Sequence, residues 1–393
     1  MGYFERSKNA FLAAYGRYDI TLDYGKGVYL YDINGKEYLD FYSGIGVNSF
    51  GYQYEPYVKN LQEQVNRLMH VSNYFNTKES VEAAEIIVEA TKLSKAFLCN
   101  SGTEATEGAL KLARKYYFTK HQKADSEIIS LNHSFHGRST GSVTLTGNPN
   151  YQETFGPLIE GVKYGNINDL ESVKQLITPK TSAIIIEPIQ GEGGVHVCTK
   201  EFLQGVRKLC DTHDIVLILD EVQCGMGRTG TIMTYMQYEI MPDIVCLAKG
   251  LGAGFPVGAF VANEKVANAM QPGDHGSTYG GNPLAGKAIC SVFEILKQDN
   301  ILKNVQDVSE YLIAALEKMV DEYDCIIERR GLGLMQALEF TMPVAPIIQK
   351  ALDKGLIVVT AGANVVRMLP PLIITTNDVD KMITLLKEIL TEI

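Results

Sequence analysis

Residues 214–250 have the sequence DIVLILDEVQCGMGRTGTIMTYMQYEIMPDIVCLAKG, and this stretch decides the fold. It contains two short apolar runs, DIVLIL and DIVCLA, and a charged side chain follows each run. Nearly continuous apolar runs are typical of strands buried on both faces of a parallel sheet. The first run ends at Asp220 and Glu221, and the second ends just before Lys249. We expect all three at the carboxyl edge of the sheet, where open α/β sheets bind ligands.

The same pattern extends on either side of this stretch. From about residue 95 to residue 262, the apolar runs AFLCN, EIISL, SAIIIEP and VGAFVA alternate with helical stretches. This alternation predicts a wound α/β sheet. Residues 20–40 instead alternate apolar and polar positions around Asn34-Gly35, which predicts an antiparallel hairpin with a two-residue loop.

The order of these elements predicts two domains. A chain of 393 residues, 46% of them hydrophobic, can bury a large core and exceeds the usual size of one domain. We expect a large ligand-binding domain at residues 46–284 and a smaller domain built from residues 1–45 and 285–393. The last helix is expected within DVDKMITLLKEIL, with Thr376 and Asn377 as candidate N-caps.

Composition and charge argue against several classes of protein. The formal net charge of -10 disfavours nucleic-acid binding, which needs a positive surface. No apolar run approaches the roughly 18 residues that span a bilayer, and the N-terminus lacks the apolar core of a signal peptide, so we expect a cytoplasmic protein without membrane contact. The seven cysteines never form a C-x-x-C pair, so neither a disulfide framework nor a zinc site is expected.

A candidate phosphate site lies in residues 96–115, AFLCNSGTEATEGALKLARK, where a strand leads into an amphipathic helix. Ser101 and Glu104 fit a capping box. Gly102 allows a ligand to approach the backbone, and the free amides and dipole of the first helical turn favour an anion. Many ordinary helices begin in this way, so the segment alone also fits a purely structural helix start.

The charged strand ends add two further groups. Asp220 fits a simple helix cap, but a buried carboxylate there would also keep a cationic ring nitrogen protonated. Most lysines are solvated surface charges, whereas one at the mouth of a buried strand is partly desolvated and has the lowered pKa that bonding to a carbonyl group requires. A phosphate cradle, an acid and Lys249 at one sheet edge together predict a pocket for pyridoxal 5′-phosphate (PLP).

Over nearly its whole length the chain resembles the class III (ornithine-type) aminotransferases. The motifs that carry the resemblance are, in order, GVYLYDINGKEYLDF, NSGTEATEGALKLARK, SFHGRSTGSVTLTGNPNYQETFGPL, EPIQGEGGV, LILDEVQCGMGRTG, AKGLGAGFPVGA, HGSTYGGNPLA and VVRMLPPL. The resemblance implies fold type I of the PLP-dependent transferases, with a large, mainly parallel seven-stranded sheet domain and a smaller α+β domain. Within the family the chain is most similar to the branch that acts on N-acetylornithine.

The resemblance also implies roles in cofactor binding. Lys249 would attach PLP covalently and move a proton between the substrate carbon and the cofactor, and Asp220 would pair with the ring nitrogen. The other expected cofactor contacts are Gly102 and Thr103 at the phosphate, Phe135 on the ring, Glu221, Val222, and Gln223 at the ring oxygen. Thr278 would reach the phosphate of the partner subunit's cofactor, which implies a homodimer with shared active sites.

The resemblance assigns four residues to the substrates. Arg138 would bind the substrate α-carboxylate, with Ser277 nearby. Arg367 would bind a second carboxylate, that of 2-oxoglutarate, and Glu192 would cover it while the amine donor is bound. The implied reaction belongs to arginine biosynthesis: N-acetylornithine gives its terminal amine to 2-oxoglutarate, and the products are N-acetylglutamate 5-semialdehyde and glutamate.

The choice of amine donor rests on two features, FHGR where relatives have FWGR, and Ile45 where ornithine aminotransferases have a tyrosine. An apolar Ile45 cannot hydrogen-bond a free α-amine. Succinylornithine, ornithine and 4-aminobutyrate remain alternative donors. Two segments depart from the family pattern: residues 51–56, GYQYEP, replace Gly-His-x-His-Pro, and Ala248 replaces the threonine before the cofactor lysine.

Two other motifs would indicate different chemistry, but their sequence context does not support it. Residues 225–230, GMGRTG, satisfy G-x-G-x-x-G and suggest a nicotinamide-dependent dehydrogenase. The glycines, however, lie several residues beyond the strand, and no acidic residue ends a second strand about 20 residues on. His133 and His136 form an H-x-x-H pair without a third ligand at metal-site spacing, so we expect no metal there and a structural or cofactor-adjacent role.

Overall fold

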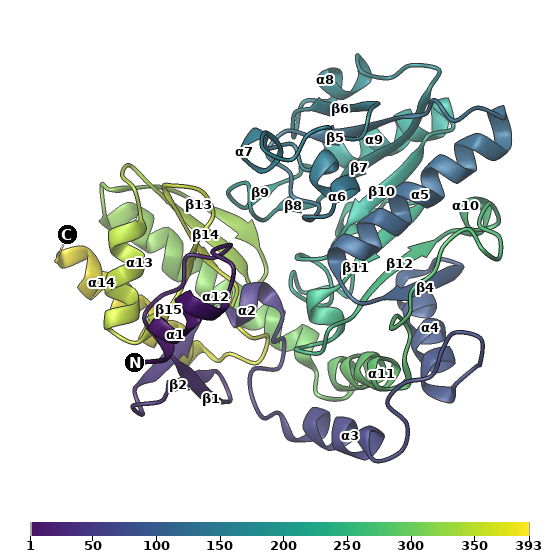
Figure 1. The fold of residues 1–393 in the computed structure, drawn as a ribbon. Helices are drawn as coiled ribbons and strands as arrows, with labels where there is room; N and C mark the ends of the chain where they lie inside the picture. Colours follow the sequence, from purple (N-terminus) through teal and green to yellow (C-terminus); the bar gives the residue numbers. More distant parts are fainter. Residues whose placement is uncertain (1, 393) are drawn as a thin grey trace.

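A seven-stranded sheet forms the core of the larger part of the chain in the computed structural model, which describes residues 2–392 (Figure 1). Its strands lie in the order β4-β12-β11-β10-β7-β5-β6. Their bounds are β4 (Lys95–Cys99), β5 (Glu127–Leu131), β6 (Val162–Gly165), β7 (Thr181–Ile186), β10 (Val216–Asp220), β11 (Ile244–Leu247) and β12 (Gly258–Ala262). Each apolar run quoted above forms one of these strands, and β6, at the sheet edge, is the strand that those runs did not include.

The direction of these strands brings the predicted ligand-binding groups to one edge. β5 runs parallel to β6 and β7, and β10 runs parallel to β7 and β11, whereas β12 runs antiparallel to β11 and β4. The predicted α/β class with a mainly parallel seven-stranded sheet is confirmed. The register pairs Asp220 with Cys246, so the end of β10 lies beside the end of β11, shortly before Lys249.

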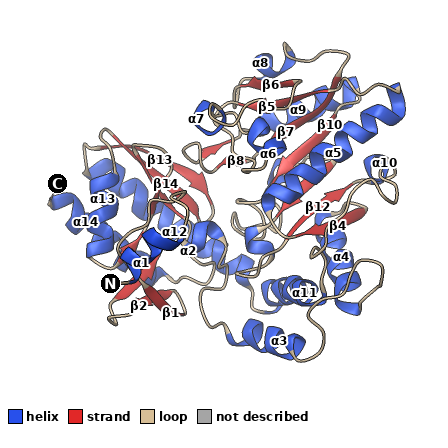
Figure 2. Ribbon diagram, viewed as in Figure 1, coloured by secondary structure: helices blue, strands red, loops and turns tan. Residues whose placement is uncertain are grey.

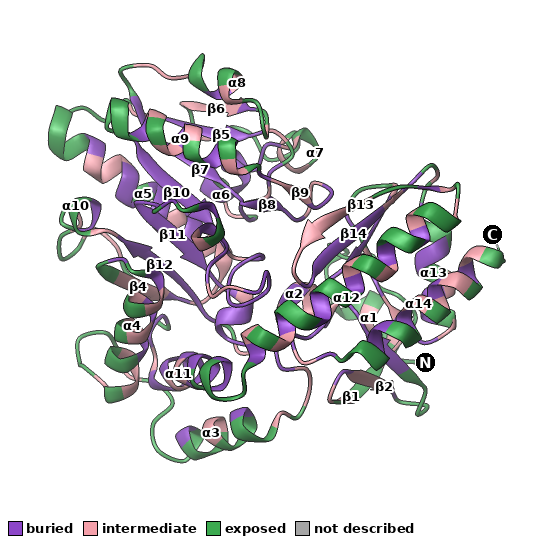
Figure 3. Cartoon of the chain, turned by 180° about the vertical axis from the view of Figure 1, so that it is seen from behind, coloured by how far each residue is buried: buried purple, intermediate pink, exposed green. Residues whose placement is uncertain are grey.

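Successive side chains on the central strands enter two different hydrophobic clusters. Leu217 and Leu219 of β10 belong to one cluster, whereas Ile218 belongs to the other, together with Ile244 of β11. All four are at most 1% exposed, and the strands are buried along their length (Figure 3). Burial on both faces explains why these strands have continuous apolar runs rather than an alternating pattern.

Helices cover both faces of the sheet (Figure 2). The face covered by α5 (Gly102–His121) includes Ala105, Ala109 and Leu112 in its cluster, while α9 (Lys200–His213) packs into the other cluster. The remaining helices of this part are α3 (Glu55–Val65), α4 (Lys78–Thr91), α6 (Thr140–Leu145), α7 (Pro149–Gln152), α8 (Leu170–Lys174), α10 (Glu264–Ala267) and α11 (Pro283–Gln298). None of the helices within residues 2–392 is long and apolar enough to cross a membrane.

A smaller part joins the two ends of the chain. β3 pairs in parallel with β15, which ties the N-terminal strands to the C-terminal segment. Its elements are α1 (Tyr3–Ala10), β1 (Leu22–Lys26), β2 (Tyr29–Asp32), β3 (Glu37–Asp40), α2 (Ser43–Gly46), α12 (Ile301–Glu322), β13 (Ile326–Leu332), β14 (Met335–Phe340), α13 (Ala345–Asp353), β15 (Leu356–Ile357), β16 (Val359–Thr360), β17 (Val365–Met368) and α14 (Thr376–Thr391). This pairing supports a small domain made from both ends of the chain. Because α11 packs against α3 and α4 of the larger part, we propose that the C-terminal portion of the small domain begins after α11 rather than at residue 285.

Two local predictions need correction. The loop between β2 and β3 spans residues 33–36 rather than two residues, and Gly35 takes the left-handed conformation (φ 82°) that lets the chain reverse there. The last helix has Thr375 as its N-cap, one residue before the predicted caps. The Thr375 side chain accepts the N–H of Asp378, and the Asp378 carboxylate accepts the N–H of Thr375, which completes a capping box.

Gly108 allows α5 to pack closely on β12, and this position provides a test of the fold. A Cβ added at Gly108 would lie 2.1 Å from a ring carbon of Phe260, a buried side chain stacked on Phe97. Because the buried ring has no free space, we expect Gly108→Ala to lower the free energy of unfolding by about 1–3 kcal/mol despite its better helix propensity. Chemical denaturation measures this, with Thr119→Ala on the exposed face of α5 as the control. Equal stability of Gly108→Ala and the unaltered protein would contradict the packing.

Candidate active site

A cavity of about 460 Å³ opens at the carboxyl edge of the seven-stranded sheet. It lies between the start of α5, the loop after β5 and the ends of β10 and β11. The predicted site residues that line it are Gly102, Thr103, Phe135, Arg138, Asp220, Val222, Gln223 and Lys249. Segments that are far apart in the sequence therefore meet at the edge where the sequence placed the ligand.

The first turn of α5 forms the anion-binding end of this cavity. Ser101 is the N-cap and accepts the N–H of Glu104. The Glu104 carboxylate accepts the N–H of Asn100 (2.9 Å) and the hydroxyl of Ser101 (2.9 Å). Ser101 therefore caps the helix as predicted, but the reciprocal bond of the capping box goes to the N–H of Asn100 rather than to that of Ser101. The first amides of a helix have no partner within it, and at Gly102 a Cβ would lie 2.8 Å from a methyl of Val222. The turn thus presents bare backbone to the cavity, as a phosphate site requires.

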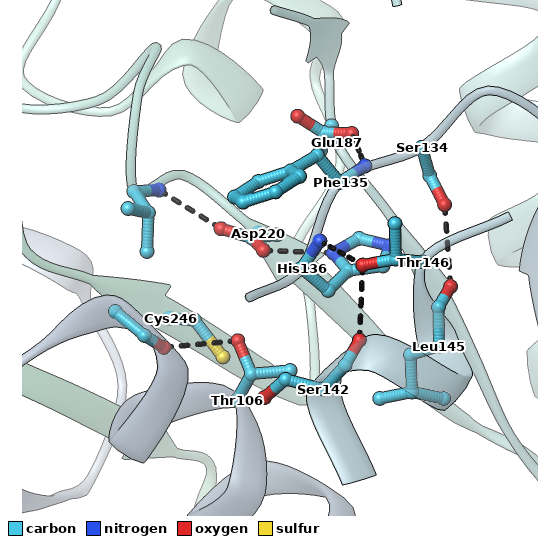
Figure 4. Close-up of polar contacts among 12 residues, drawn as sticks. Thr106, Ser134, Phe135, His136, Ser142, Leu145, Thr146, Glu187, Asp220 and Cys246 are labelled. Atoms are coloured by element: carbon cyan, nitrogen blue, oxygen red, sulfur yellow. Dashed lines mark hydrogen bonds and ion pairs between the residues drawn. The ribbon is translucent and has the colours of Figure 1, made fainter. Parts of the chain in front are cut away.

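Asp220 is held at the floor of the cavity by two hydrogen bonds (Figure 4). The carboxylate is 4% exposed. Its Oδ2 lies 2.8 Å from Nδ1 of His136, and its Oδ1 accepts the N–H of Val222 at 3.1 Å. An ionised carboxylate can only accept, so Nδ1 of His136 carries the hydrogen. These two hydrogen bonds fix the orientation of the Asp220 carboxylate at the cavity.

A second buried carboxyl, Glu187, lies near the first. Its Oε2 accepts the N–H of Phe135 at 2.8 Å, which ties the loop after β5 to the end of β7 (Figure 4). Burial raises the pKa of Glu187 to about 7; His136 counteracts this rise and Asp220 adds to it. A negative charge on Asp220 therefore disfavours a second negative charge beside it.

Lys249 follows β11 and enters the cavity from a strained backbone. Its φ is +45°, which is uncommon for a residue with a side chain and is typical of functional sites. Burial lowers the pKa of the Lys249 amine, and this effect outweighs the opposing charge of Glu192. A larger fraction of the amine is then neutral, and the neutral amine is the form that attacks a carbonyl.

Arg367 and Glu192 form a buried ion pair next to the cavity. Nη1 of Arg367 lies 2.7 Å from Oε1 of Glu192, and Nη2 lies 3.2 Å from Oε2. Gln223, which lines the cavity, accepts from Arg367 at 3.1 Å and donates to Glu192 at 3.3 Å. Burial works to raise the pKa of Glu192, but Arg367 outweighs burial and the pKa is lowered. Arg367 thus contacts a residue of the cavity lining, Gln223, whereas Arg138 lines the cavity itself.

Several predicted residues lie outside the cavity lining. The carboxylate of Glu221 accepts the N–H groups of Thr234 and Tyr235, each at 2.7 Å, so it holds the loop after β10 rather than pointing at a ligand. Ser277 accepts the side-chain amide of Asn100 at 3.2 Å. Thr278 is exposed and lines a separate hollow on the surface.

Ile45 also lies outside the lining of the cavity. It packs against a small apolar cluster that includes Leu369. Val47, two residues further along the chain, does line the cavity. Its φ of 66° is unusual for a β-branched side chain. The Ile45 side chain is therefore in an apolar environment, and its backbone lies in a strained turn.

Sequence reasoning missed two residues of this site. His136 was assigned only a structural or cofactor-adjacent role, and Glu187 was not assigned at all. Glu187 follows the buried run SAIIIEP, so the rule that selected Asp220, an acid at the end of a buried strand, would also have selected Glu187. No local signal indicates that His136 pairs with Asp220, because the two lie 84 residues apart.

Comparisons with known proteins agree with this geometry. A family model described as aminotransferase class-III matches residues 13–390. An acetylornithine aminotransferase of Clostridium acetobutylicum is 46% identical over 383 residues, covering 97% of this chain and 99% of that protein. The structure of N-acetylornithine aminotransferase from Stenotrophomonas maltophilia K279a has a TM-score of 0.86 at 34% identity, covering 99% of this chain and 98% of that one. An ornithine aminotransferase of Toxoplasma gondii, solved with partial occupancy of PLP at its active site, has a TM-score of 0.94 at 29% identity, covering 99% and 94%.

The hydrogen bond from His136 to Asp220 can be tested by its effect on PLP binding. In His136→Phe the Asp220 carboxylate loses its N–H donor, and hydrogen bonds to charged groups are worth enough that we expect the Kd for PLP to rise about 10- to 100-fold. His136→Asn keeps an N–H at a similar reach and is expected to recover part of the loss. Absorbance titration of the apoprotein measures Kd, with His133→Asn at the exposed neighbour as control. An unchanged Kd in His136→Phe would contradict this role.

Proposed function

The chain belongs to the class III aminotransferases, which have fold type I and use PLP, and we propose that it is an acetylornithine aminotransferase. In this proposal it transfers the terminal amine of N-acetylornithine to 2-oxoglutarate, a step of arginine biosynthesis. The observation that carries the proposal is the cavity itself, in which a helix N-terminus, a buried carboxylate and a desolvated lysine converge. A cytoplasmic location stays a prediction.

The residues of the cavity fit the cofactor. The bare first turn of α5 at Gly102 and Thr103 would hold the phosphate, and the face of Phe135 would support the ring. Asp220 would pair with the ring nitrogen, and Lys249 would form the covalent attachment. Bound in this way, PLP supplies an electron-withdrawing pyridinium ring that accepts the electron pair released at the substrate carbon.

The residues of this chain supply binding and proton transfer. Asp220, fixed by His136, keeps a positive charge on its ring-nitrogen partner. Burial lowers the pKa of Lys249 and so favours its neutral amine, which would remove a proton from the substrate carbon that bears the amine and deliver it to the cofactor carbon on the other side of the amine nitrogen. Because its pKa is raised to about 7, Glu187 is about half protonated at pH 7, so it adds less negative charge beside Asp220 than an ordinary carboxylate would.

Two arginines would allow one cavity to bind the amine donor and the amine acceptor in turn. N-acetylornithine has one carboxylate, which Arg138 would bind, while Glu192 neutralises Arg367. Because 2-oxoglutarate has two carboxylates, the second would displace Glu192 and pair with Arg367. The same site would thus accept a monocarboxylate donor and a dicarboxylate acceptor without leaving a buried charge unpaired.

The choice among donors rests on finer features. Ile45 is apolar and does not line the cavity, so this position supplies no hydrogen bond to a free α-amine, which favours an acylated donor over ornithine. The acetylornithine aminotransferase of Clostridium acetobutylicum is also more similar in sequence than the ornithine aminotransferase of Toxoplasma gondii. Succinylornithine and 4-aminobutyrate are the remaining alternatives, and a direct comparison of donors separates them.

We also propose a homodimer with shared active sites. The hollow that contains Thr278 has a volume of about 890 Å³ and lies beside the exposed aromatic residues Tyr74 (94% exposed) and Tyr279 (64% exposed). Exposed apolar groups gathered around a hollow are typical of an interface. Thr278 does not line the cavity of its own subunit, which supports a contact with the cofactor phosphate of a partner subunit.

An absorbance spectrum tests the proposed reaction. With PLP bound, we expect a band of the lysine-attached cofactor that N-acetylornithine removes and 2-oxoglutarate restores. Lys249→Ala should lack the band because the attaching amine is missing, whereas Lys123→Ala, at an exposed position, should retain it. A band unchanged by N-acetylornithine would point to succinylornithine, ornithine or 4-aminobutyrate as donor, and the absence of any band would contradict the PLP assignment.

Shared active sites predict complementation between two inactive variants. Lys249→Ala removes the attaching amine, and Thr278→Glu places a negative charge against the phosphate, so each homodimer is expected to be inactive. In a mixed dimer one site would combine both changes and the other would have neither. Co-expression should therefore restore about a quarter of the activity of the unaltered protein under statistical pairing. If Thr278 served the site of its own subunit, no activity would return.

A further inference from the structure

Arg138 is held by aromatic rings rather than by an acid. Its guanidinium carbon lies 4.1 Å from the centroid of the Tyr151 ring and 5.4 Å from that of the Phe135 ring. The two rings meet edge to face, 5.7 Å apart at 80°. Within residues 2–392 Arg138 has no carboxylate or hydrogen-bond partner, although it lines the cavity. Its N–H edge is therefore free for a ligand while its face is supported.

The turn that carries Tyr151 is fixed to the body of the protein. Tyr151 lies in α7, and the side-chain amide of the next residue, Gln152, donates to three carbonyl groups at the end of α6. The distances are 3.1 Å to Val143, 3.2 Å to Thr144 and 2.6 Å to Thr146. The two N–H groups of this amide are shared among the three carbonyls, which also accept from Thr146, Asn148 and Tyr164, so Gln152 adds bonds that tie the turn to the end of α6. The Tyr151 ring is presented from a rigid position.

We propose that Tyr151 positions Arg138 for the substrate carboxylate and so sets the preference for carboxylate-bearing amine donors. This inference rests on the proposed function, in which Arg138 binds that carboxylate. A ring face attracts the guanidinium without occupying the N–H groups that bind a carboxylate in the bidentate geometry. An acid in the place of Tyr151 would compete with the substrate, as Glu192 does at Arg367.

The two arginines therefore differ in availability. Arg367 is 3% exposed and paired with Glu192, so a substrate group must displace an acid to reach it. Arg138 is exposed on the cavity side and supported only by rings, so it is open to every substrate that carries the carboxylate. Loss of the Tyr151 ring is expected to leave Arg138 charged but poorly oriented, which weakens binding without affecting the lysine that performs proton transfer.

The test compares two donors that differ only in the carboxylate, N-acetylornithine and N-acetylputrescine. For Tyr151→Leu we expect kcat/KM with N-acetylornithine to fall about 3- to 30-fold, mainly through KM, which corresponds to the usual range for a cation–π contact. With N-acetylputrescine, which has no carboxylate to bind, kcat/KM should stay unchanged. Tyr151→Phe keeps the ring and should behave like the unaltered protein with both donors.

Two further variants separate positioning from damage to the fold. In an Arg138→Leu background, Tyr151→Leu should cause no additional loss, because the group that it positions is absent. The cofactor absorbance band should be retained in Tyr151→Leu, since Lys249 and Asp220 are untouched. An equal fall for both donors in Tyr151→Leu, or an additive loss in the double variant, would overturn the inference.

Failure of the proposed function is distinguishable from failure of this inference. If the unaltered protein does not prefer N-acetylornithine to N-acetylputrescine, the role of Arg138 in binding the carboxylate is wrong, and the inference that rests on it is overturned with it. If the unaltered protein has the preference and Tyr151→Leu retains it in full, the proposed function stands and the positioning role of Tyr151 is wrong.

Discussion

The parallel pairing of β10 with β11 inside a sheet that is buried on both faces is the constraint on which the site depends. It places Asp220 and the chain just before Lys249 side by side at one edge. Because the strands are buried by helices on each face, these charged groups can exist only at the edge, where the cavity opens. The position of the acid and of the lysine is thus a consequence of sheet topology rather than of local sequence.

Burial at this edge makes ionised side chains unfavourable, and the surrounding residues compensate for most of these charges. Lys249 loses solvation and its pKa falls, whereas Glu187 loses solvation and its pKa rises to about 7, so both groups tend toward the neutral form. Asp220 is hydrogen-bonded to His136 and to a backbone amide. Arg367 and Glu192 neutralise each other. Few charged groups around the cavity are therefore uncompensated among the described residues, and a ligand with a cationic ring and carboxylates would match the groups that remain.

The sequence predicted the features that depend on short-range pattern. Apolar runs gave six of the seven strands, and Ser101 was found as the cap of α5 because a cap and its helix are adjacent in the chain. The edge strand β6 was missed, since its residues, VKYG, are only half-buried and lack a continuous apolar run. Contacts between distant segments were not predictable in this way. His136 and Asp220 are 84 residues apart, and only the register of the folded sheet and its loops brings them together.

The resemblance to a family implied carboxylate-binding roles for Arg138 and Arg367, but their different surroundings appear only in the folded chain. An arginine that must bind in every half-reaction is best supported by groups that do not compete for its N–H donors, and the Tyr151 and Phe135 rings meet that requirement. An arginine needed in only one half-reaction would have to be neutralised in the other, and the partly buried Glu192, which pairs with Arg367, is in a position to do this. Aromatic support at one arginine and acidic cover at the other follow from the need to bind two substrates in turn in one cavity.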